Sequence, residues 1–543
     1  MLGLMMDRPL LISQILEFAA VNFPDQEIVS RTVEGPMHRY TYPEMAARTR
    51  KLANALEALG AQAEDRVGTI AWNTHRHLEI YYASSGMGTV CHTMNPRLPP
   101  EQLIYIVNHA EDRFIFVDLT FLPLLEKLHE HFPSVEGFVV MTDEENMPDT
   151  TLPKVYCYET LLKDQSAQYS WPEFDEHTAS SLCYTSGTTG NPKGVLYSHR
   201  STVLHALFVL SISGVPIDES STILPVVPMF HVNAWGSPYF GLMAGVKMVF
   251  PGPRMDGPSL AALIEEEKVT DAWGVPTVWM GLLGHMRDEG KTFSTLKRTL
   301  IGGSALPRAM IEEFKEEHGV EAIQGWGMTE MSPLGTVAIP RPTLRGDWDR
   351  ELKIRGTQGR LIFGVEMKIV DADGKELPHD GVAQGELLVR GNAVISGYYE
   401  NPEANAKAFD DDGWFRTGDV SVIDQDGYME IVDRVKDVIK SGGEWISSID
   451  LENEAMAHPE LAEAAVIGVN HSRWQERPLL IAVRSKDAKV SSEDVLAFLS
   501  ERVEKWWLPD DVVFVDELPH GATGKLQKAQ LREDFKDYKL PTE

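Results

Sequence analysis

Residues 184 to 194 read Tyr-Thr-Ser-Gly-Thr-Thr-Gly-Asn-Pro-Lys-Gly and follow the run 180–183 directly. This composition is typical of a loop that binds phosphate. Glycines let backbone N–H groups approach an anion closely, while hydroxyl groups and a lysine add donors and positive charge. A flexible Gly/Thr turn between a strand and a helix is the alternative. The expected phosphate ligands are Thr185, Ser186, Gly187, Thr188, Thr189, Gly190 and Lys193.

The loop differs from the common P-loop. That pattern has a glycine, four further residues and then Gly-Lys-Ser/Thr, whereas here Lys193 follows Pro192 and precedes Gly194. The difference disfavours a GTPase or a kinase of the P-loop kind.

Length and composition restrict the class of protein. A chain of 543 residues exceeds what one hydrophobic core serves, so several subdomains and a further domain are expected. The net charge of −31 argues against nucleic acid or an anionic membrane as a partner. Three scattered cysteines without a CxxC spacing suit a reducing compartment. The first residues carry neither a basic region nor a continuous apolar run, so no signal peptide or membrane span is expected, and the predicted location is cytoplasmic.

The pattern of apolar residues predicts an α/β fold. From about residue 65 to 324, short β-branched runs alternate with amphipathic stretches, which is typical of parallel sheets flanked by helices. The strands are expected at 67–72, 114–117, 138–141, 247–250 and 271–275, and two of the helices at 260–267 and 310–317.

The last third of the chain has a different residue pattern. After about Gly359, strands separated by Asp-Gly dipeptides predict a β-rich subdomain. The final hundred or so residues are enough for a separate domain, with strands at 464–469 and 479–483 and a helix at 495–506. We therefore expect a large N-terminal domain, 1–434, of αβ-layered subdomains plus the β-rich subdomain, and a small mobile C-terminal α+β domain, 435–543.

Four further motifs follow the phosphate loop: Gly-Gly-Ser at 302–304, Gly-Trp-Gly-Met-Thr-Glu at 325–330, Gly-Trp-Phe-Arg-Thr-Gly-Asp at 413–419, and Gly-Lys at 524–525. In this order and at these separations they resemble the adenylate-forming superfamily, which includes acyl-CoA synthetases, peptide-synthetase adenylation domains and firefly-type luciferases. The resemblance covers essentially the whole chain. It implies an enzyme that activates a carboxylic acid with ATP and Mg²⁺ and then transfers the acyl group to CoA.

The resemblance also implies roles for the motifs around the nucleotide. Glu330 and Thr185 would hold Mg²⁺, a hard cation that prefers oxygen ligands. Trp326, where the family usually has Tyr, would pack against adenine. The alternatives are a solvated glutamate and a buried core tryptophan. The remaining nucleotide contacts would come from Gly302, Gly303, Ser304, Gly325, Gly327, Met328 and Thr329.

Three further polar side chains resemble known contacts to the nucleotide. Asp419 and Arg434 would clamp the ribose hydroxyls, although Asp419 also fits a plain turn residue. Lys525 resembles the essential lysine that bridges the carboxylate and the α-phosphate. The preceding residues 520–522, His-Gly-Ala, depart from the basic residue and the Ser or Thr that the family often has there.

The junction at residues 433–443 resembles the family's hinge, about which the C-terminal domain rotates between the two half-reactions. Lys436 matches the hinge position, and a pantetheine tunnel is implied at Lys440, Gly442, Gly443, Glu444 and Trp445. An ordinary surface loop and a Gly-bulged strand are the alternatives.

The segment 228–235, Pro-Met-Phe-His-Val-Asn-Ala-Trp, resembles the one that gates the acyl tunnel of bacterial fatty-acyl-CoA synthetases. Trp235 matches the gating tryptophan of those enzymes, and His231 matches an aromatic residue in the wall of the tunnel. We also expect His231, Lys525 and Glu330 to be catalytic. A core histidine is the alternative for His231. The pocket would be completed by Val275, Gly303, Gly325, Met331 and Pro333.

No cation or acidic group faces the predicted acid, which favours an unsubstituted aliphatic one. Within the superfamily the chain resembles bacterial 3-methylmercaptopropionate-CoA ligases of dimethylsulfoniopropionate breakdown. A medium-chain fatty-acyl-CoA ligase is the nearest alternative. A stand-alone peptide-synthetase adenylation domain and a nucleotide switch that only hydrolyses ATP or GTP are more distant ones. Similar enzymes are often dimers, so a homodimer is expected.

Overall fold

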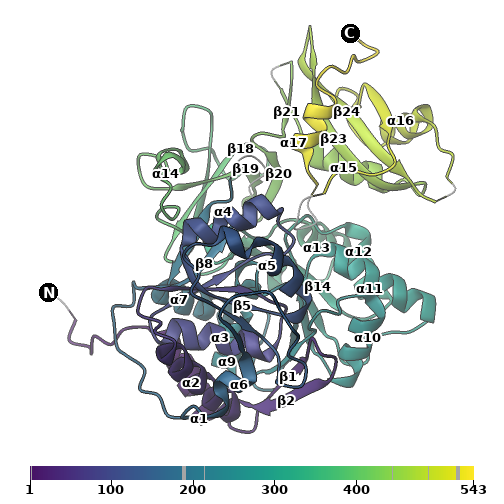
Figure 1. The fold of residues 1–543 in the computed structure, drawn as a ribbon. Coiled ribbons are helices and arrows are strands. Elements are labelled where there is room, and N and C mark those ends of the chain that lie inside the picture. The colour runs from purple at the N-terminus through teal and green to yellow at the C-terminus, as the bar shows by residue number, and fades with distance from the viewer. Residues whose placement is uncertain (2, 186–190, 213, 443, 487, 521–525) are drawn as a thin grey trace. The chain divides into compact units, whose positions relative to one another are not determined.

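A computed structural model describes residues 1, 3–185, 191–212, 214–442, 444–486, 488–520 and 526–543 (Figure 1). The described chain forms two compact units. The first comprises 1–185, 191–365 and 391–408, and the second comprises 366–390 and 409–543. Among the described residues, no helix is both long and apolar enough to cross a membrane.

The first unit contains a seven-stranded sheet that is parallel except for its last pair. Its strand order is β7 (Val155–Cys157), β6 (Gly137–Val140), β5 (Asp112–Val117), β3 (Arg66–Ile70), β4 (Val90–Thr93), β8 (Ala179–Tyr184) and β9 (Gly194–Ser198). The helix before the first of these strands is α2 (Tyr42–Ala58), and the helices between them are α3 (His75–Gly86), α4 (Pro100–Ala110), α5 (Leu122–Leu128) and α6 (Tyr158–Lys163).

A nine-stranded sheet forms the rest of the first unit's framework. Its order is β16 (Arg360–Leu361), β15 (Leu334–Val337), β14 (Glu321–Gly327), β13 (Arg298–Ile301), β12 (Asp271–Gly274), β10 (Thr222–Pro225), β11 (Lys247–Phe250), β1 (Glu27–Arg31) and β2 (Met37–Thr41). The helices of this region are α1 (Ile12–Asn22), α7 (His199–Leu210), α9 (Ser237–Ala244), α10 (Gly257–Glu266), α11 (Pro276–Glu289), α12 (Arg308–Glu316), α13 (Trp348–Gly356) and, further along the chain, α14 (Pro402–Ala408).

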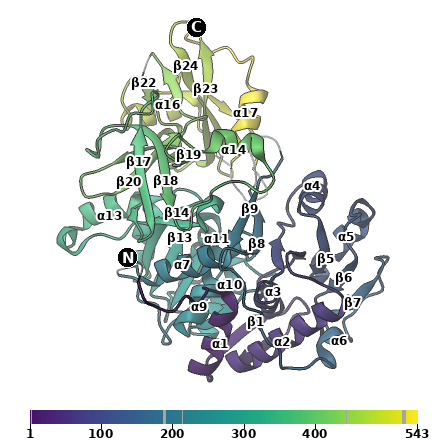
Figure 2. The same ribbon diagram turned by 90° about the vertical axis from the view of Figure 1, so that its left-hand side faces the viewer.

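Different helices cover the two faces of the nine-stranded sheet. Trp279, Leu282 and Phe314 of α11 and α12 are buried in one core cluster with the sheet residues Ala272 and Ile301. The side chains of alternate residues point to the opposite face. There Trp273 stacks on Phe240 of α9, with ring centroids 4.8 Å apart. α1 packs beside α9, and α2 beside α6 (Figure 2).

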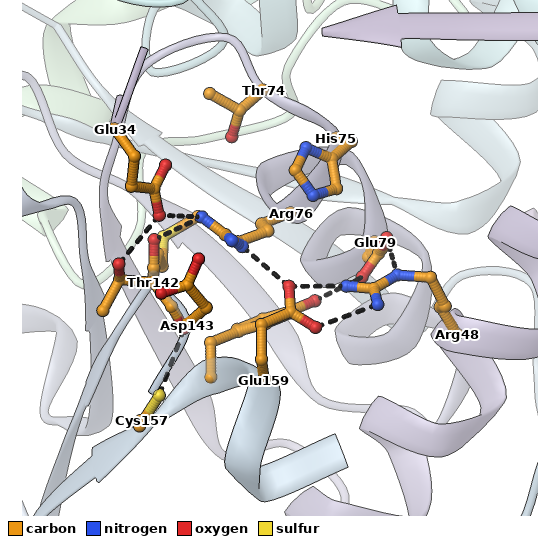
Figure 3. Close-up of polar contacts among 12 residues, drawn as sticks. Glu34, Arg48, Thr74, His75, Arg76, Glu79, Thr142, Asp143, Cys157 and Glu159 are labelled. Carbon is orange, nitrogen blue, oxygen red and sulfur yellow. Dashed lines mark hydrogen bonds and ion pairs between the residues drawn. The ribbon is translucent and has the colours of Figure 1, made fainter. Parts of the chain in front are cut away.

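A network of charged side chains ties α2, α3, α6 and the β1–β2 hairpin together (Figure 3). Arg48 lies 2.8 Å from Glu79 and 2.9 Å from Glu159, and Arg76 lies 2.9 Å from Glu159 and 2.7 Å from Glu34. Burial would raise the pKa of Glu159, but the two arginines outweigh it and hold that pKa below its ordinary value. Each buried charge therefore has an opposite charge beside it, which offsets the cost of removing it from water.

The second unit contains two sheets. A four-stranded sheet has the order β17 (Val365–Val370), β18 (Gly385–Gly391), β19 (Phe415–Ile423) and β20 (Met429–Arg434). A five-stranded sheet joins β22 (Glu444–Ile446), β21 (Ile439–Ser441), β24 (Gln475–Arg484) and β23 (Leu461–His471), with β25 (Asp511–Phe514) parallel to β24. Its helices are α15 (Ser448–Met456), α16 (Ser492–Ser500) and α17 (Lys528–Asp534).

The predicted α/β class and the predicted β-rich region after residue 359 are confirmed. The predicted strands and helices of the first unit lie within a few residues of those observed. One helix boundary is wrong. α16 ends at Ser500 instead of continuing to residue 506. The chain turns after this end, and Val503 and Trp507 pack against the same core cluster as Val495 and Leu499. Tertiary packing thus overrides a helical pattern that the sequence would extend.

Candidate active site

The two ends of the predicted phosphate loop lie on neighbouring antiparallel strands, β8 and β9. The backbone N–H of Thr185 donates to the carbonyl of Lys193 at 2.9 Å, and the N–H of Lys193 donates to the Thr185 hydroxyl at 3.3 Å. Tyr399 N–H donates to the carbonyl of Gly194 at 2.8 Å. The loop therefore joins two strands, not a strand and a helix, and its phosphate-binding role stays a prediction. Ser186, Gly187, Thr188, Thr189 and Gly190 lie outside the described residues.

Glu330 is buried, with 7% of its surface exposed, so the alternative of a solvated glutamate is wrong. It lies in the short helical turn η3 (Thr329–Met331) after β14. The hydroxyl of Tyr398 donates to Glu330 Oε1 at 2.8 Å, and Ile395 N–H donates to the Glu330 carbonyl at 2.9 Å. Tyr197 donates through its hydroxyl to the Thr329 carbonyl at 2.6 Å. Both the carboxylate and the backbone of this turn are thus held in place.

Tyr398 connects Glu330 to the end of the phosphate loop. The ammonium group of Lys193 lies 4.8 Å from the centre of the Tyr398 ring, a cation–π contact. Burial first, and then the neighbouring Glu330, raise the pKa of Tyr398 well above its ordinary value, so the hydroxyl stays protonated and donates. The backbone at Tyr398 is fixed on both sides by Asn405, which accepts at 2.6 Å and donates at 3.1 Å.

Sequence reasoning missed Tyr398. The signal available was the run Gly397-Tyr398-Tyr399, with two aromatic residues after a glycine. Nothing local in that run points to Glu330 or Lys193, because both contacts are made by folding distant segments together.

Apart from the phosphate loop, the predicted nucleotide residues of the first unit directly follow β13 or lie in β14 and the turn after it. Trp326 is buried in β14, and an added side chain at Gly335 would meet both Trp326 and Met331. At Gly302, a side chain would stand 2.8 Å from the Gly325 carbonyl. The absence of Cβ there lets two strands approach closely, a packing reason for the glycine in addition to the predicted one. Ser304 is exposed, and Gly327, Met328 and Thr329 follow directly along the chain before Glu330.

Two of the predicted gate and pocket residues, Trp235 and Val275, lie close to the glycines at the end of β13. Trp235 Cη2 lies 3.3 Å from the position that a Cβ of Gly302 would occupy, and Val275 Cγ1 lies 3.2 Å from the corresponding position of Gly303. His231 is half-buried at the start of this segment. Met331 and Pro333 lie on the turn between β14 and β15, where Met328 N–H donates to the Pro333 carbonyl at 3.1 Å.

The gate segment α8 (Val232–Trp235) has a left-handed backbone, with φ of 47°, 52°, 48° and 56° along its four residues. Such a conformation costs about 1–2 kcal/mol per residue for L-amino acids. Asn233 helps to hold it by donating to Ser181 Oγ at 3.0 Å and accepting from the Tyr81 hydroxyl at 3.2 Å. Strained backbone that its surroundings hold in place is typical of functional segments.

His205 of α7 supports the same region from the side. Its Nε2 accepts from Leu334 N–H at 3.1 Å, and its ring lies against Gly236, directly after the gate. Burial lowers the pKa of His205 to about 3, so the ring is neutral and can accept this bond. The role of His205 was not predicted, since a lone histidine in the apolar pattern of a helix carries no specific signal.

In the second unit, Asp419 is 4% exposed and lies opposite Arg434 on β19 and β20, with 2.8 Å between Oδ1 and Nη1. The two side chains predicted to clamp ribose therefore form an ion pair. Asp419 extends from strand β19, so it is not only a turn residue. Whether it binds ribose remains a prediction.

The predicted hinge residue Lys436 lies between two carboxylates: Asp437 contacts α17 directly, and Asp433 is linked to α17 through Ser448. Asp437 pairs with Arg532 at 2.5 Å, and Asp433 accepts from Ser448, whose hydroxyl also accepts from Lys528 at 2.5 Å. Burial lowers the pKa of Lys436. Sequence reasoning missed these contacts, which join the junction to the helix that follows the lysine motif. Lys525 itself lies outside the described residues.

The residues predicted to line a pantetheine tunnel form a hairpin instead of one bulged strand. Lys440 of β21 is paired with Trp445 of β22, and Ser441 with Glu444. Gly442 has φ of +62°, and a side chain there would stand 2.9 Å from the Trp474 ring. Gly443 lies outside the described residues.

Among the described residues, no group of three His, Cys, Asp or Glu side chains has the geometry to hold a metal ion. A single carboxylate still fits Mg²⁺, because this ion usually takes one or two carboxylates and completes its shell with substrate phosphates and water. The buried, oriented carboxylate of Glu330 near the end of a phosphate-type loop is a donor of that kind.

The chain is similar to known proteins over nearly its whole length. The family model described as AMP-binding enzyme matches residues 16–399, and the AMP-binding enzyme C-terminal domain matches 450–525. A 3-methylmercaptopropionyl-CoA ligase of Ruegeria lacuscaerulensis is 52% identical over 538 residues, 99% of both chains. A medium-chain-fatty-acid–CoA ligase of Ectopseudomonas oleovorans is 49% identical, covering 99% of this chain and 98% of that protein. A crystal structure of an anthranilate CoA ligase in complex with anthranoyl-AMP superposes with a TM-score of 0.86 at 25% identity, covering 97% of this chain and 98% of that one.

Proposed function

The chain belongs to the AMP-binding enzyme family, and on that premise we propose that it is an AMP-forming acyl-CoA ligase. In the first half-reaction an oxygen of the acid attacks the α-phosphorus of ATP, giving acyl-AMP and pyrophosphate. In the second, the sulfur of CoA attacks the acyl carbon, giving acyl-CoA and AMP. The observation that carries the proposal is the arrangement of Lys193, Tyr398 and Glu330 at the end of the phosphate loop.

The residues of the first unit bind and orient the nucleotide in this proposal. Thr185, Lys193 and the loop between them hold the phosphates, and Trp326 packs against adenine. Glu330 and Thr185 hold Mg²⁺, which when bound offsets negative charge on the phosphates. Tyr398 keeps Glu330 and Lys193 at fixed positions, so little reorganisation is needed when charge develops on the α-phosphate.

The second unit supplies the remaining groups. Asp419 and Arg434 hold the ribose, Lys525 stabilises charge on the α-phosphate during adenylation, and Lys436 is the hinge at the boundary between 1–434 and 435–543. The hairpin that carries Lys440, Gly442, Gly443, Glu444 and Trp445 guides the pantetheine arm of CoA. These roles rest on the motifs.

We propose 3-methylmercaptopropionate as the preferred acid, supported by 52% identity to a ligase named for it. A medium-chain fatty acid is the second candidate, supported by 49% identity to a medium-chain ligase. The predicted pocket around Trp235, Val275 and Gly303 is apolar, which suits both acids. A cytoplasmic location and a homodimer complete the proposal.

The test is a substrate screen with ATP, Mg²⁺ and CoA, scored for AMP and for acyl-CoA. Straight-chain acids of four to ten carbons are compared with 3-methylmercaptopropionate. Formation of AMP and acyl-CoA together supports the ligase. AMP-forming transfer only to a carrier-protein thiol would indicate a peptide-synthetase domain, and release of ADP or GDP without an acid would indicate a nucleotide switch.

A further inference from the structure

The face of the nine-stranded sheet opposite α11 and α12 carries three successive rows of side chains. Trp273, Leu300 and Ile323 are in register across β12, β13 and β14. Two residues further toward the carboxyl ends are Val275 and Gly302, which directly follow β12 and β13, and Gly325 of β14. Val275 and Gly325 belong to the predicted acid pocket, and Gly302 belongs to the predicted nucleotide site. Because side chains alternate along a strand, both rows point to the same face.

The third row, two residues toward the amino ends, is charged. It consists of Asp271, Arg298 and Glu321, again in register. Arg298 Nε lies 2.6 Å from Asp271 Oδ1, and Arg298 Nη2 donates to Asp271 Oδ2 at 3.0 Å and to the Pro216 carbonyl at 3.1 Å. The Asp271 side chain is 2% exposed and that of Arg298 is 16% exposed. This ion pair therefore closes the face at its far edge.

An apolar cavity of about 20 Å³ lies over the middle row. Trp273, Leu300 and Ile323 line it from the sheet, Val209 and Ile212 from the end of α7 and the residues after it, and the Arg298–Asp271 pair bounds it. A space of this size holds one methyl-sized or water-sized group, and the apolar lining gives a water few partners. Leu300 Cδ1 lies 3.4 Å from the position that a Cβ of Gly325 would occupy, so the middle row directly continues the upper one.

We propose that the end of the acyl chain lodges in this cavity and that the Arg298–Asp271 ion pair is the floor that limits chain length. The inference rests on the proposed acyl-CoA ligase activity and deepens it. Leu300 and Ile323 give the end of the chain an apolar surface in this cavity. Placing a hydrocarbon against the charged pair would cost desolvation without a compensating contact.

The spacing of the rows indicates the longest acyl chain that fits above the ion pair. The upper and lower rows are four residues apart, about 13 Å at 3.3 Å per residue, roughly the length of an extended chain of ten carbons. Short acids occupy only the upper row, and medium-length acids reach the cavity. The protein therefore accepts both candidate acids and rejects long-chain ones.

Two variants test the floor and the cavity separately. The double variant Asp271→Ser with Arg298→Ala removes the pair without leaving a lone buried charge. We expect it to raise kcat/KM for dodecanoate relative to octanoate at least tenfold. Val209→Phe fills the cavity from α7 and should lower kcat/KM for octanoate relative to butanoate at least tenfold.

Matched controls use exposed positions. Arg287→Ala breaks the exposed ion pair with Glu313, and Leu207→Phe enlarges a residue that is 48% exposed on α7. Neither control should change the chain-length profile. If a test variant fails to fold, as judged from Tm, Val209→Leu, which adds a single methylene, takes its place. We expect it to lower kcat/KM for octanoate relative to butanoate threefold.

Profiles of the folded test variants that parallel the wild type would overturn the inference while leaving the ligase intact. Absence of acyl-CoA from every acid with the wild-type protein would instead overturn the proposed function. The two failures are therefore distinguishable in one set of assays.

Discussion

The hydroxyl of Tyr398 donates a 2.8 Å hydrogen bond to Oε1 of Glu330, a residue 68 positions earlier in the chain. The same tyrosine presents its ring to the ammonium group of Lys193 at 4.8 Å. One side chain therefore positions both the proposed Mg²⁺ ligand and the cation of the phosphate loop, and the two contacts use different parts of it.

The first prediction separates these two contacts. Tyr398→Phe removes the hydrogen bond to Glu330 but keeps the ring beside Lys193. A hydrogen bond to a charged group contributes roughly 1.5–3 kcal/mol. The Mg²⁺ concentration needed for half-maximal ATP–pyrophosphate exchange should therefore rise about tenfold. Calorimetry of ATP binding without Mg²⁺ should be unchanged. Tyr398→Leu should weaken that binding as well. Tyr399→Phe is the control, and an unaltered Mg²⁺ dependence in Tyr398→Phe would count against the positioning role.

Lys525→Ala should lower adenylation roughly 10²- to 10³-fold, the usual loss when one preorganised donor to a developing charge is removed. Thioester formation from synthetic acyl-AMP and CoA should survive, because the lysine is proposed to act only on the α-phosphate. Lys536→Ala, an exposed lysine paired with Glu533, is the matched control. Equal losses in both half-reactions of a folded variant would show that the assignment is wrong.

Lys436→Pro should separate the half-reactions in the opposite sense. Proline fixes φ near −65°, so a hinge that needs two backbone settings would be held in one of them. Acyl-AMP formation should persist while thioester formation drops. Lys436→Ala removes the charge without restricting φ and should retain both steps. If the proline variant loses both steps equally at unchanged Tm, the hinge role is refuted.

Trp235→Ala tests the gate through a series of acids from four to ten carbons. We expect kcat/KM for 3-methylmercaptopropionate and butanoate to fall, while octanoate falls less or gains, because a short chain loses the indole that packs on it. The shift should be gradual, since a methylene in an apolar pocket is worth about 1–3 kcal/mol. Trp506→Ala, a tryptophan that is 42% exposed, is the control. A uniform drop across all lengths would identify Trp235 as a packing residue.

His205 should make the protein acid-sensitive. Its folded pKa of about 3 lies below the ordinary 6.5, so the unfolded chain binds a proton below pH 6.5 that the native ring does not. The stability is thus fully present above pH 6.5 and falls by about 2 kcal/mol between pH 6.5 and 5. His205→Gln keeps an acceptor for Leu334 but does not titrate, so its Tm should decline less steeply over this range. Parallel Tm curves for the two proteins would contradict the expectation.

Much of the candidate site was predictable because its residues are contiguous. The phosphate loop, the Gly-Trp-Gly-Met-Thr-Glu motif and the gate segment each combine residue types that need one another locally, and the parallel sheet followed from alternating β-branched and amphipathic stretches. The end of α16 at Ser500 was missed, because Val503 and Trp507 leave the helical path to reach the core. The contact of α17 with Asp437, and its link to Asp433 through Ser448, were missed because no periodicity connects these residues.

By itself, the sequence determined the family, the α/β architecture and the residues proposed to bind nucleotide, since these depend on local composition and on the order of motifs along the chain. Only the tertiary structure decided that Tyr398 joins Glu330 to Lys193 and that Arg298 and Asp271 close the face below Leu300. The physical reason is that a hydrogen bond, a cation–π contact and a sheet register are set by the distance between atoms in space. Segments separated by tens of residues reach those distances only when the whole unit folds.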